Sequence, residues 1–238
     1  MYFGNYLSYL IFAAPVIILS LIAQAKVNGA YKKYSKILNS RNLTGASAAQ
    51  LILNHYGITD VRIEPCSGKL TDHYSPKEKV IRLSQGVYGS SSVAAVGIAC
   101  HEAGHAAQHA ENYLPNTIRT ALVPVTNFGS RFGLIIAFLG YFLAYLANSE
   151  IGFYVIVVGL ALYGLVSVFQ LVTLPVEFNA SRRALRVIEE TGMLVDDEYN
   201  GAKKVLSAAA MTYVAALATS LMNLLYYALR LLGNNRRR

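Results

Sequence analysis

Long uncharged apolar runs are the feature that most constrains this chain. The first run covers residues 6–25 and the third covers 151–174, and neither contains a charged side chain. A helix needs about 20 apolar residues to cross the hydrocarbon core of a bilayer. Since 54% of the 238 residues are hydrophobic, the chain is too apolar for an ordinary soluble domain. We therefore expect an α-rich integral membrane protein with three or four transmembrane helices and a small α+β domain.

The second and third apolar runs are separated by a very short polar break. The second run covers about 133–147, or begins nearer Ile118, and only residues 148–150 separate it from the third. So short a break predicts a helical hairpin that crosses the membrane and returns. The hairpin would place Arg131 and Glu177 on the same side of the membrane.

The first and last runs each leave an alternative open. Residues 23–25, Ala-Gln-Ala before Lys26, resemble a signal-peptidase site. No basic segment precedes the run, however, and it is longer than the apolar part of most signal peptides, so we interpret it as a retained anchor. The last run, 205–232, contains Asn223. It could span the membrane, lie partly in the interface, or pack its first half under the active site.

The basic residues gather beside the apolar runs. The net charge is +8, but these residues do not form a polar face with interleaved aromatic side chains, which argues against a nucleic-acid partner. Lys and Arg near span ends mark the cytoplasmic side. We therefore expect the N-terminus outside, and the following residues on the cytoplasmic side: Lys26, Lys32, Lys33, Lys36, Arg41, Arg119, Arg131, Arg182, Arg183 and Arg186. Arg236, Arg237 and Arg238 break this pattern if the last run spans fully.

The polar segment 26–117 is predicted to form the small α+β domain. Thr44 can cap a helix that runs to Tyr56 and ends at Gly57. Residues 61–64 and 80–83 alternate as strands, and 73–76 between them are rich in turn-forming residues. The serines at 90–92 open a long helix that runs to about Ala110. The expected divisions are 1–25, an anchor; 26–117, the polar domain; 118–175, the hairpin; 176–203, a helix and loop; and 204–238, an apolar helix with a basic tail.

The long helix carries the sequence HEAGH at 101–105. Residues four apart lie on one face of a helix, so His101 and His105 can offer imidazole nitrogens to one metal ion, with Glu102 beside them as a general base. The motif is short, but the rest of the helix is apolar. Burial of two imidazoles and a carboxylate without partners would cost several kcal/mol. A bound metal ion removes that cost.

A hydrolytic zinc site usually has three protein ligands, so a third must come from elsewhere in the chain. The long HExxH signature with a third histidine on the same helix fails, because Gln108 and Glu111 occupy the positions that need Gly and His. His109 lies two turns, about 12 Å, beyond His101 and is expected to support the site or the fold. Glu150 lies in the hairpin loop across the membrane. We predict Glu177 as the third ligand, with Glu111 as the alternative and an ordinary helix N-terminal charge as the other interpretation of Glu177.

A family resemblance covers most of the chain. The HEAGH motif, the pair of spans and the segment VEFNASRRA at 176–184 resemble the YugP-type bacterial neutral zinc metallopeptidases, and more distantly the HtpX and CAAX prenyl protease gluzincins. The segments at 72–74 and 79–84 also resemble the YugP-type pattern. The resemblance implies a zincin-like domain, Zn²⁺ as cofactor, proteolysis and a membrane setting. In the HtpX-like relatives the second motif is Glu-x-x-Ala-Asp, whose Asp supports a metal-binding His; this chain has Ser181 there, which can make one weaker hydrogen bond.

These observations predict a membrane-embedded, zinc-dependent endopeptidase that hydrolyses peptide bonds with a metal-activated water and Glu102 as general base. The expected partners are a protein or peptide substrate, membrane proteins included, and the bilayer; the expected site is the cell membrane, with the active site on the cytoplasmic side. The strand at 80–83 is either a sheet edge to which substrate adds or an ordinary core strand. His73, Tyr74 and Arg182 are unranked candidates for a second oxyanion donor. The alternative function is an inactive homologue that acts as a membrane scaffold or partner-binding protein.

Overall fold

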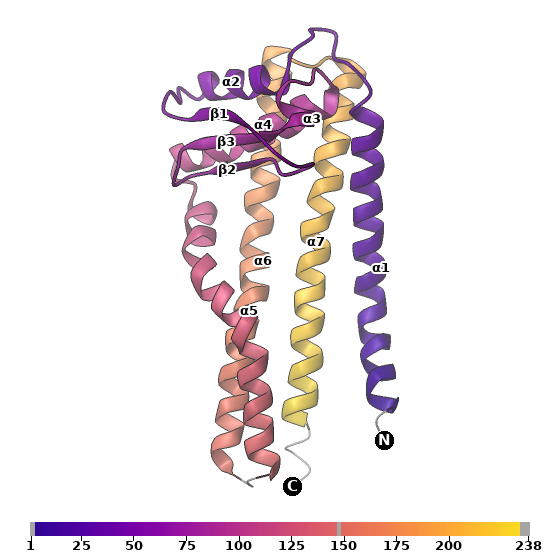
Figure 1. Cartoon of the computed structure of the whole chain (residues 1–238), viewed down its shortest axis with the longest axis vertical. Helices are drawn as coiled ribbons and strands as arrows, with labels where there is room; N and C mark the ends of the chain where they lie inside the picture. The colour runs from indigo at the N-terminus through magenta and orange to yellow at the C-terminus, as the bar shows by residue number, and fades with distance from the viewer. Residues whose placement is uncertain (1–2, 147–148, 234–238) are drawn as a thin grey trace. The chain divides into compact units, whose positions relative to one another are not determined.

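The computed structural model describes residues 3–146 and 149–233 (Figure 1). The chain is mostly helical, with one small sheet. The helices are α1 (Phe3–Tyr34), α2 (Gly45–His55), α3 (Gln85–Tyr88), α4 (Val93–Ala110), α5 (Leu114–Leu146), α6 (Glu150–Thr191) and α7 (Asp196–Gly233), and the strands are β1 (Arg62–Cys66), β2 (His73–Ser75) and β3 (Val80–Ser84). The expected basic tail at 236–238 and the loop residue Asn148 lie outside the described residues.

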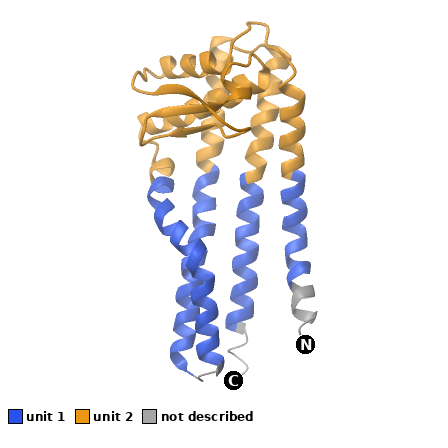
Figure 2. Cartoon of the chain, viewed as in Figure 1, with its two compact units in different colours: residues 1–22, 118–174, 213–238 blue, residues 23–117, 175–212 orange. Residues whose placement is uncertain are grey.

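The chain divides into two compact units, each assembled from separate stretches of sequence (Figure 2). Unit 1 contains the apolar parts of the four long helices, and unit 2 contains the sheet and the HEAGH helix. The residues are 1–22, 118–174 and 213–238 in unit 1, and 23–117 and 175–212 in unit 2.

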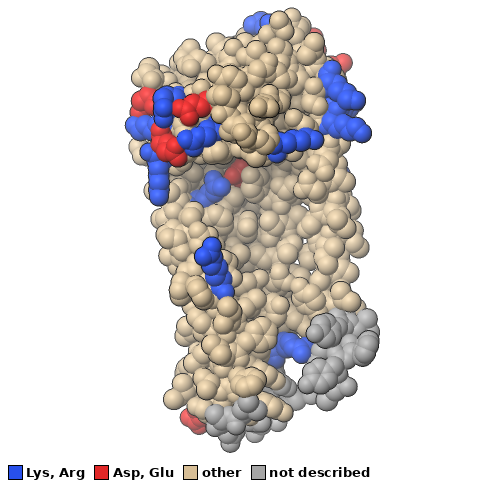
Figure 3. All heavy atoms as spheres, in the orientation of Figure 1, with Lys and Arg blue, Asp and Glu red and all other residues tan. Residues whose placement is uncertain are grey.

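Unit 1 has the composition of a membrane-spanning helical bundle. Among the described residues, four helices are long and apolar enough to cross a bilayer. Large apolar side chains such as Leu139, Phe142 and Leu171 are more than half exposed, as expected for side chains that face lipid. On the face that Figure 3 shows, most charged side chains lie over the residues of unit 2. The predicted α-rich membrane protein with a small α+β part is confirmed.

Glycines allow α5 and α6 to pack backbone against backbone within unit 1. A Cβ atom placed on Gly140 would lie 2.5 Å from the amide nitrogen of Ile156, and one on Gly159 would lie 2.3 Å from that of Ala137. Such approaches exclude any side chain at these positions. The hairpin predicted from the short polar break is therefore closely packed.

The sheet of unit 2 has the strand order β1-β3-β2. β3 pairs in parallel with β1 and antiparallel with β2. The interpretation of 80–83 as a sheet edge is therefore wrong, and the alternative of a core strand holds, with Ile81 and Leu83 fully buried. The segment at 73–76 was expected to be a turn, but residues 73–75 form strand β2. Alternation cannot reveal so short a strand, because three residues contain too little pattern.

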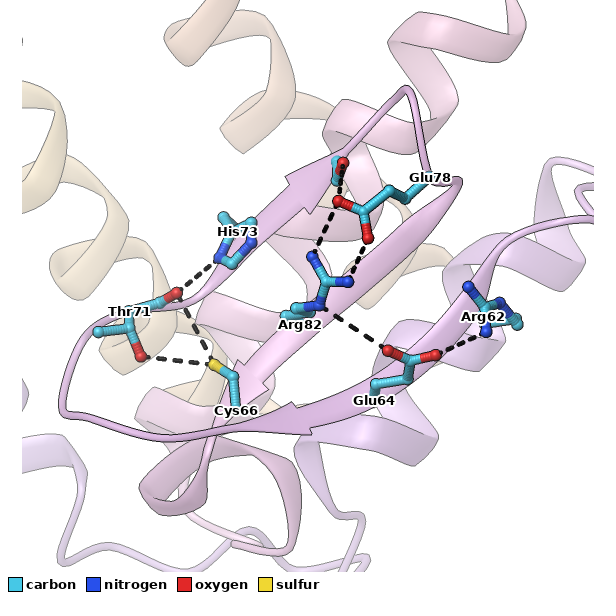
Figure 4. Close-up of polar contacts among 8 residues, drawn as sticks. Arg62, Glu64, Cys66, Thr71, His73, Glu78 and Arg82 are labelled. Atoms are coloured by element: carbon cyan, nitrogen blue, oxygen red, sulfur yellow. Dashed lines mark hydrogen bonds and ion pairs between the residues drawn. The ribbon is translucent and has the colours of Figure 1, made fainter.

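The two faces of the sheet differ in polarity. Arg82 of β3 pairs with Glu64 of β1 and with Glu78 of the turn between β2 and β3, while Arg62 lies 2.8 Å from Glu64 (Figure 4). This charged network occupies the face exposed to solvent. The opposite face contributes Ile81 and Leu83 to the core of unit 2. Asp72, which precedes β2, accepts hydrogen bonds from the backbone and hydroxyl of Ser84, and so connects the two ends of the hairpin.

Helix α4 runs through the core of unit 2. Ser92 caps its N-terminus by accepting a hydrogen bond from the backbone of Ala95 at 3.2 Å. Thr44 caps α2 in the same way, and Gly57 follows that helix with φ +65°, both as predicted. Helix α4 carries small buried side chains, which let α2 and the sheet approach it closely: Ala94, Ala95, Ala99, Ala103, Ala106 and Ala107. Its two motif histidines are thereby held in a packed core.

Candidate metal centre

Three candidate ligands meet in the interior of unit 2. His101 and His105 of α4 lie one turn apart, and Glu177 comes from α6. Their ligand atoms all lie within 4.8 Å of one another. The Nε2 atoms of His101 and His105 are 3.3 and 3.5 Å from the same carboxylate oxygen, Oε2 of Glu177. Glu177 is only 3% exposed. The structure therefore brings together the three residues that the sequence suggested as ligands.

A buried glutamine fixes the tautomer of His105. Gln108 is fully buried, and its side-chain nitrogen donates to the backbone carbonyl of Val176 at 2.7 Å and to Oδ1 of Asn179 at 2.9 Å. Because that nitrogen is the donor, the amide oxygen of Gln108 is the group that faces Nδ1 of His105, at 3.1 Å. An amide oxygen only accepts, so Nδ1 of His105 carries a proton, and Nε2, which faces Glu177, is the nitrogen left to bind a metal ion.

Arg183 fixes the next member of this network. Its Nε donates to Oδ1 of Asn179 at 2.7 Å, which identifies that atom as the amide oxygen. A second guanidinium nitrogen pairs with Glu111 at 2.6 Å. The guanidinium also lies over the rings of Tyr56 and Tyr113, 5.7 and 5.9 Å from their centroids. The orientation of His105 is thus connected to an anchored arginine through two side-chain amides.

The second histidine has a simpler partner. The hydroxyl of Ser181 lies 3.0 Å from Nδ1 of His101. The side chain at 181 therefore occupies the place in which the HtpX-like pattern has an aspartate, and it reaches the histidine. A hydroxyl carries no charge, so it supports the imidazole less strongly than a carboxylate would.

Gly104, inside the motif, determines how closely the two helices approach. A Cβ atom at this position would lie 2.6 Å from the backbone oxygen of Ala180. Ala180 lies between Glu177 and Ser181, which both contact the histidines. The absence of a side chain at 104 therefore lets α6 come near enough for these contacts.

The electrostatics of the centre follow from burial and mutual contact. Burial would lower the pKa of His105, but the hydrogen bond to Glu177 and the charge of Glu102 outweigh it, so this pKa is raised. Burial would raise the pKa of Glu177, but hydrogen bonds from His101 and His105 hold it well below its usual range. Glu177 is therefore ionised at neutral pH, as a metal ligand must be.

The structure separates the remaining candidates from this centre. Glu111 is the C-cap residue of α4 and pairs with Arg183. His109 points to the sheet, where its Nδ1 lies 2.8 Å from the hydroxyl of Tyr74. Burial raises the pKa of Tyr74 to about 12, so its hydroxyl stays protonated. Nδ1 of His73 is hydrogen-bonded to the backbone oxygen of Thr71 at 2.8 Å (Figure 4). Tyr74 and His73 thus have partners of their own.

Sequence reasoning missed the residues that orient the histidines: Gly104, Gln108, Asn179 and Arg183. A signal existed for Gln108, which is a large polar residue in an otherwise alanine-rich stretch, one turn after His105. Asn179 and Arg183 were noted only as part of the resemblance, and nothing in their local pattern indicates that they connect two helices.

Comparisons with known proteins identify the family to which the chain belongs. A family model described as "Putative neutral zinc metallopeptidase" matches residues 9–232. The chain is 46% identical over 209 residues to "Putative membrane protease YugP" of Bacillus subtilis, which covers 88% of this chain and 90% of that protein. No solved structure matches the chain significantly. Nearly the whole length, including both helices of the centre, lies within the family match, and the chain therefore belongs to this family of neutral zinc metallopeptidases.

Proposed function

We propose that the protein is a membrane-embedded zinc endopeptidase of the gluzincin type, with His101, His105 and Glu177 as ligands. The observation that carries this proposal is the pair of distances of 3.3 and 3.5 Å from the imidazole nitrogens to one carboxylate oxygen. Zinc bonds of 2.0–2.2 Å in a tetrahedral site separate neighbouring ligand atoms by about 3.4 Å. The nitrogen and oxygen donors are also of the kind that zinc prefers, so the residues fit the ion that the family implies.

Bound zinc would polarise a water molecule and the substrate carbonyl, and would lower the pKa of the water to about 7. Glu102 follows His101 directly in α4 and is 9% exposed. We assign it as the general base, which takes the proton of the attacking water on its carboxylate and transfers it to the leaving nitrogen. Gln108 and Ser181 hold Nδ1 of His105 and of His101, so the two Nε2 atoms stay directed at one point.

The assignment of zinc and its ligands can be tested on the purified full-length protein. We expect about one zinc per chain by inductively coupled plasma mass spectrometry in the wild type and a large loss in His101→Ala. Removal of the metal with a chelator should lower Tm, because the ion binds only the folded state. Equal zinc in wild type and His101→Ala would refute the site.

Catalysis needs a separate measurement. Glu102→Gln preserves shape but removes the base, so we expect it to retain zinc and to lose cleavage of casein by about 100-fold or more. Cleavage at the wild-type rate would show that Glu102 is not the base. If the wild type holds zinc and cleaves neither casein nor membrane proteins, the alternative function applies, in which an inactive homologue acts as a scaffold.

We also propose that the protein is a multi-pass component of the cell membrane with its active site on the cytoplasmic side. The support is the bias of Lys and Arg beside the spans. An Asn116→Cys variant in a Cys66→Ala background tests this in intact cells with a membrane-impermeant thiol reagent. Protection of position 116 until the cells are opened is the expected result, and labelling from outside would reverse the orientation.

A further inference from the structure

Unit 2 also contains an open cavity of about 590 Å³ between α6 and α7. Its apolar part includes Leu185, Leu206 and Ala210, of which the last two are buried. Ser181 also lines it, and the hydroxyl of Ser181 lies 3.0 Å from His101. Ser181 therefore contacts a candidate metal ligand and also lines the cavity, so the cavity lies beside the candidate metal centre.

Three cationic side chains line this cavity, which we call the basic cavity: Arg182, Arg186 and Lys203. All three are exposed, and across residues 3–146 and 149–233 the structure gives them no acidic partner within ion-pair distance. The adjacent Arg183, in contrast, pairs with Glu111. Glu189 is the one acidic residue of the lining, so the formal net charge of the lining is +2. The cavity thus carries a net positive charge that its single carboxylate does not balance.

We propose that the basic cavity binds acidic side chains of the peptide substrate, two to four residues from the scissile bond. Along the axis of α6, the helical rise places the backbone positions of Arg182 and Arg186 about 7.5 and 13.5 Å beyond that of Glu177. An extended peptide advances about 3.3 Å per residue, so these distances correspond to about two and four residues. The proposal rests on the proposed peptidase function and specifies its substrate class.

A lipid headgroup is the competing anionic ligand, and the position of the arginines argues against it. The apolar run ends before Pro175, and Arg182 and Arg186 lie seven and eleven residues beyond that proline. These separations correspond to about 10 and 16 Å along a helix. The headgroup layer on each side of a bilayer is only about 5–8 Å thick. Both guanidinium groups therefore start from backbone positions beyond that layer, where a soluble peptide segment is the accessible anion.

The direct test measures peptide binding without cleavage. The full-length Glu102→Gln protein in phosphatidylcholine nanodiscs is titrated with three fluorescein-labelled peptides that differ only in carrying Glu, Gln or Lys on both sides of a common centre. We expect the Glu peptide to bind about tenfold more tightly than the Gln peptide, with the difference reduced at high salt. Adding Arg186→Glu and Lys203→Glu should reverse the order of the Glu and Lys peptides.

A matched control separates the cavity from general surface charge. Lys204 is also exposed on α7 but does not line the cavity, so Lys204→Glu should leave the preference unchanged. Zinc content and Tm establish that each variant is folded, and Arg186→Gln replaces the charge reversal if that variant is unstable. Equal affinity for the Glu and Gln peptides, or an unchanged preference in the reversed variant, would overturn the proposal. Loss of the preference for the Glu peptide only in nanodiscs that contain the anionic lipid phosphatidylglycerol would also overturn it, and would identify a lipid ligand.

Cleavage of the same peptides by the wild type distinguishes the proposal of the basic cavity from the proposed peptidase function. Charge-dependent binding without cleavage of any peptide would support the basic cavity and refute the peptidase function. Cleavage of all three peptides with equal kcat/KM would support the peptidase and refute the basic cavity. Faster cleavage of the Glu peptide, with the preference reversed by Arg186→Glu and Lys203→Glu, supports both.

Discussion

The two units use the same packing device for different purposes. In unit 1, Gly140 and Gly159 let α5 and α6 approach backbone to backbone, and the contacts there are apolar. In unit 2, Gly104 lets α4 approach the backbone of Ala180 on α6, but the contact is surrounded by buried polar side chains. In the first case close approach holds a hairpin together. In the second it also determines how far the histidines lie from Glu177.

This difference has an energetic reason. Apolar contacts are non-directional, so a helix pair in the membrane tolerates small shifts with a gradual loss of packing. The hydrogen bonds around Gln108 require defined distances and angles, and a buried amide that loses a partner costs about 1–3 kcal/mol. A substitution at a close helix contact should therefore impair function more in unit 2 than in unit 1, even where it lowers the free energy of unfolding equally in both.

The largest expected effect comes from removing the ligand that α6 supplies. Glu177→Ala should reduce zinc affinity about 1000-fold or more, because it deletes one of three protein ligands and leaves both histidines without their carboxylate. Glu111→Ala should change zinc affinity by less than threefold, since Glu111 pairs with Arg183 instead. Competition with a chromophoric zinc chelator measures both. A larger loss for Glu111→Ala would reverse the assignment of the third ligand.

The next effect tests the polar network itself. Gln108→Ala removes the acceptor of the Nδ1 proton of His105 and the donor to Asn179. Loss of such an orienting partner typically lowers metal affinity by 10- to 100-fold, and we expect a value in that range. A leucine at 108, of similar volume, separates lost packing from lost hydrogen bonds. If Gln108→Leu bound zinc like the wild type, the network would have no part in holding the ion.

The comparison of the two glycine contacts can be made with two alanine variants. Gly104→Ala and Gly159→Ala each place a Cβ atom within 3.0 Å of opposing backbone, and each should lower the free energy of unfolding by about 1–3 kcal/mol. Only Gly104→Ala should also weaken zinc binding. Thermal unfolding in detergent and zinc competition are measured on the same preparations. Equal zinc affinity in the two variants would contradict the role assigned to Gly104.

The smallest expected effect is at the second histidine. Ser181→Ala removes one hydrogen bond to Nδ1 of His101 at 3.0 Å. A single such bond contributes about 0.5–1.5 kcal/mol, which corresponds to a loss of zinc affinity between two- and twelvefold. Ser181→Asp restores the residue of the HtpX-like pattern and should bind zinc more tightly than the alanine variant. A loss at Ser181 that exceeds the loss at Gln108 would reverse the order of importance given to the two partners.

Much of the fold could be predicted because its signals are local. Apolar runs, caps at Thr44 and Ser92, and the i, i+4 spacing of His101 and His105 depend only on neighbours in sequence. The candidate for the third ligand was also accessible, since the predicted hairpin restricted Glu177 to the same side as the histidines. The three-residue strand β2 and the central place of β3 were not accessible in this way, because pairing between strands depends on residues distant in sequence.

The sequence by itself determined that this chain forms long apolar helices and carries His101 and His105 on one helical face with Glu102 beside them, since both follow from composition and helical periodicity. Only the tertiary structure decided which side chains hold those histidines in place. Gln108 lies on α4, whereas Asn179 and Arg183 lie on α6, and they acquire their roles through hydrogen bonds whose direction and length depend on how these two helices pack. The basic cavity likewise could be recognised only in the structure, because the distances between charged side chains of α6 and α7 determine which of them form ion pairs.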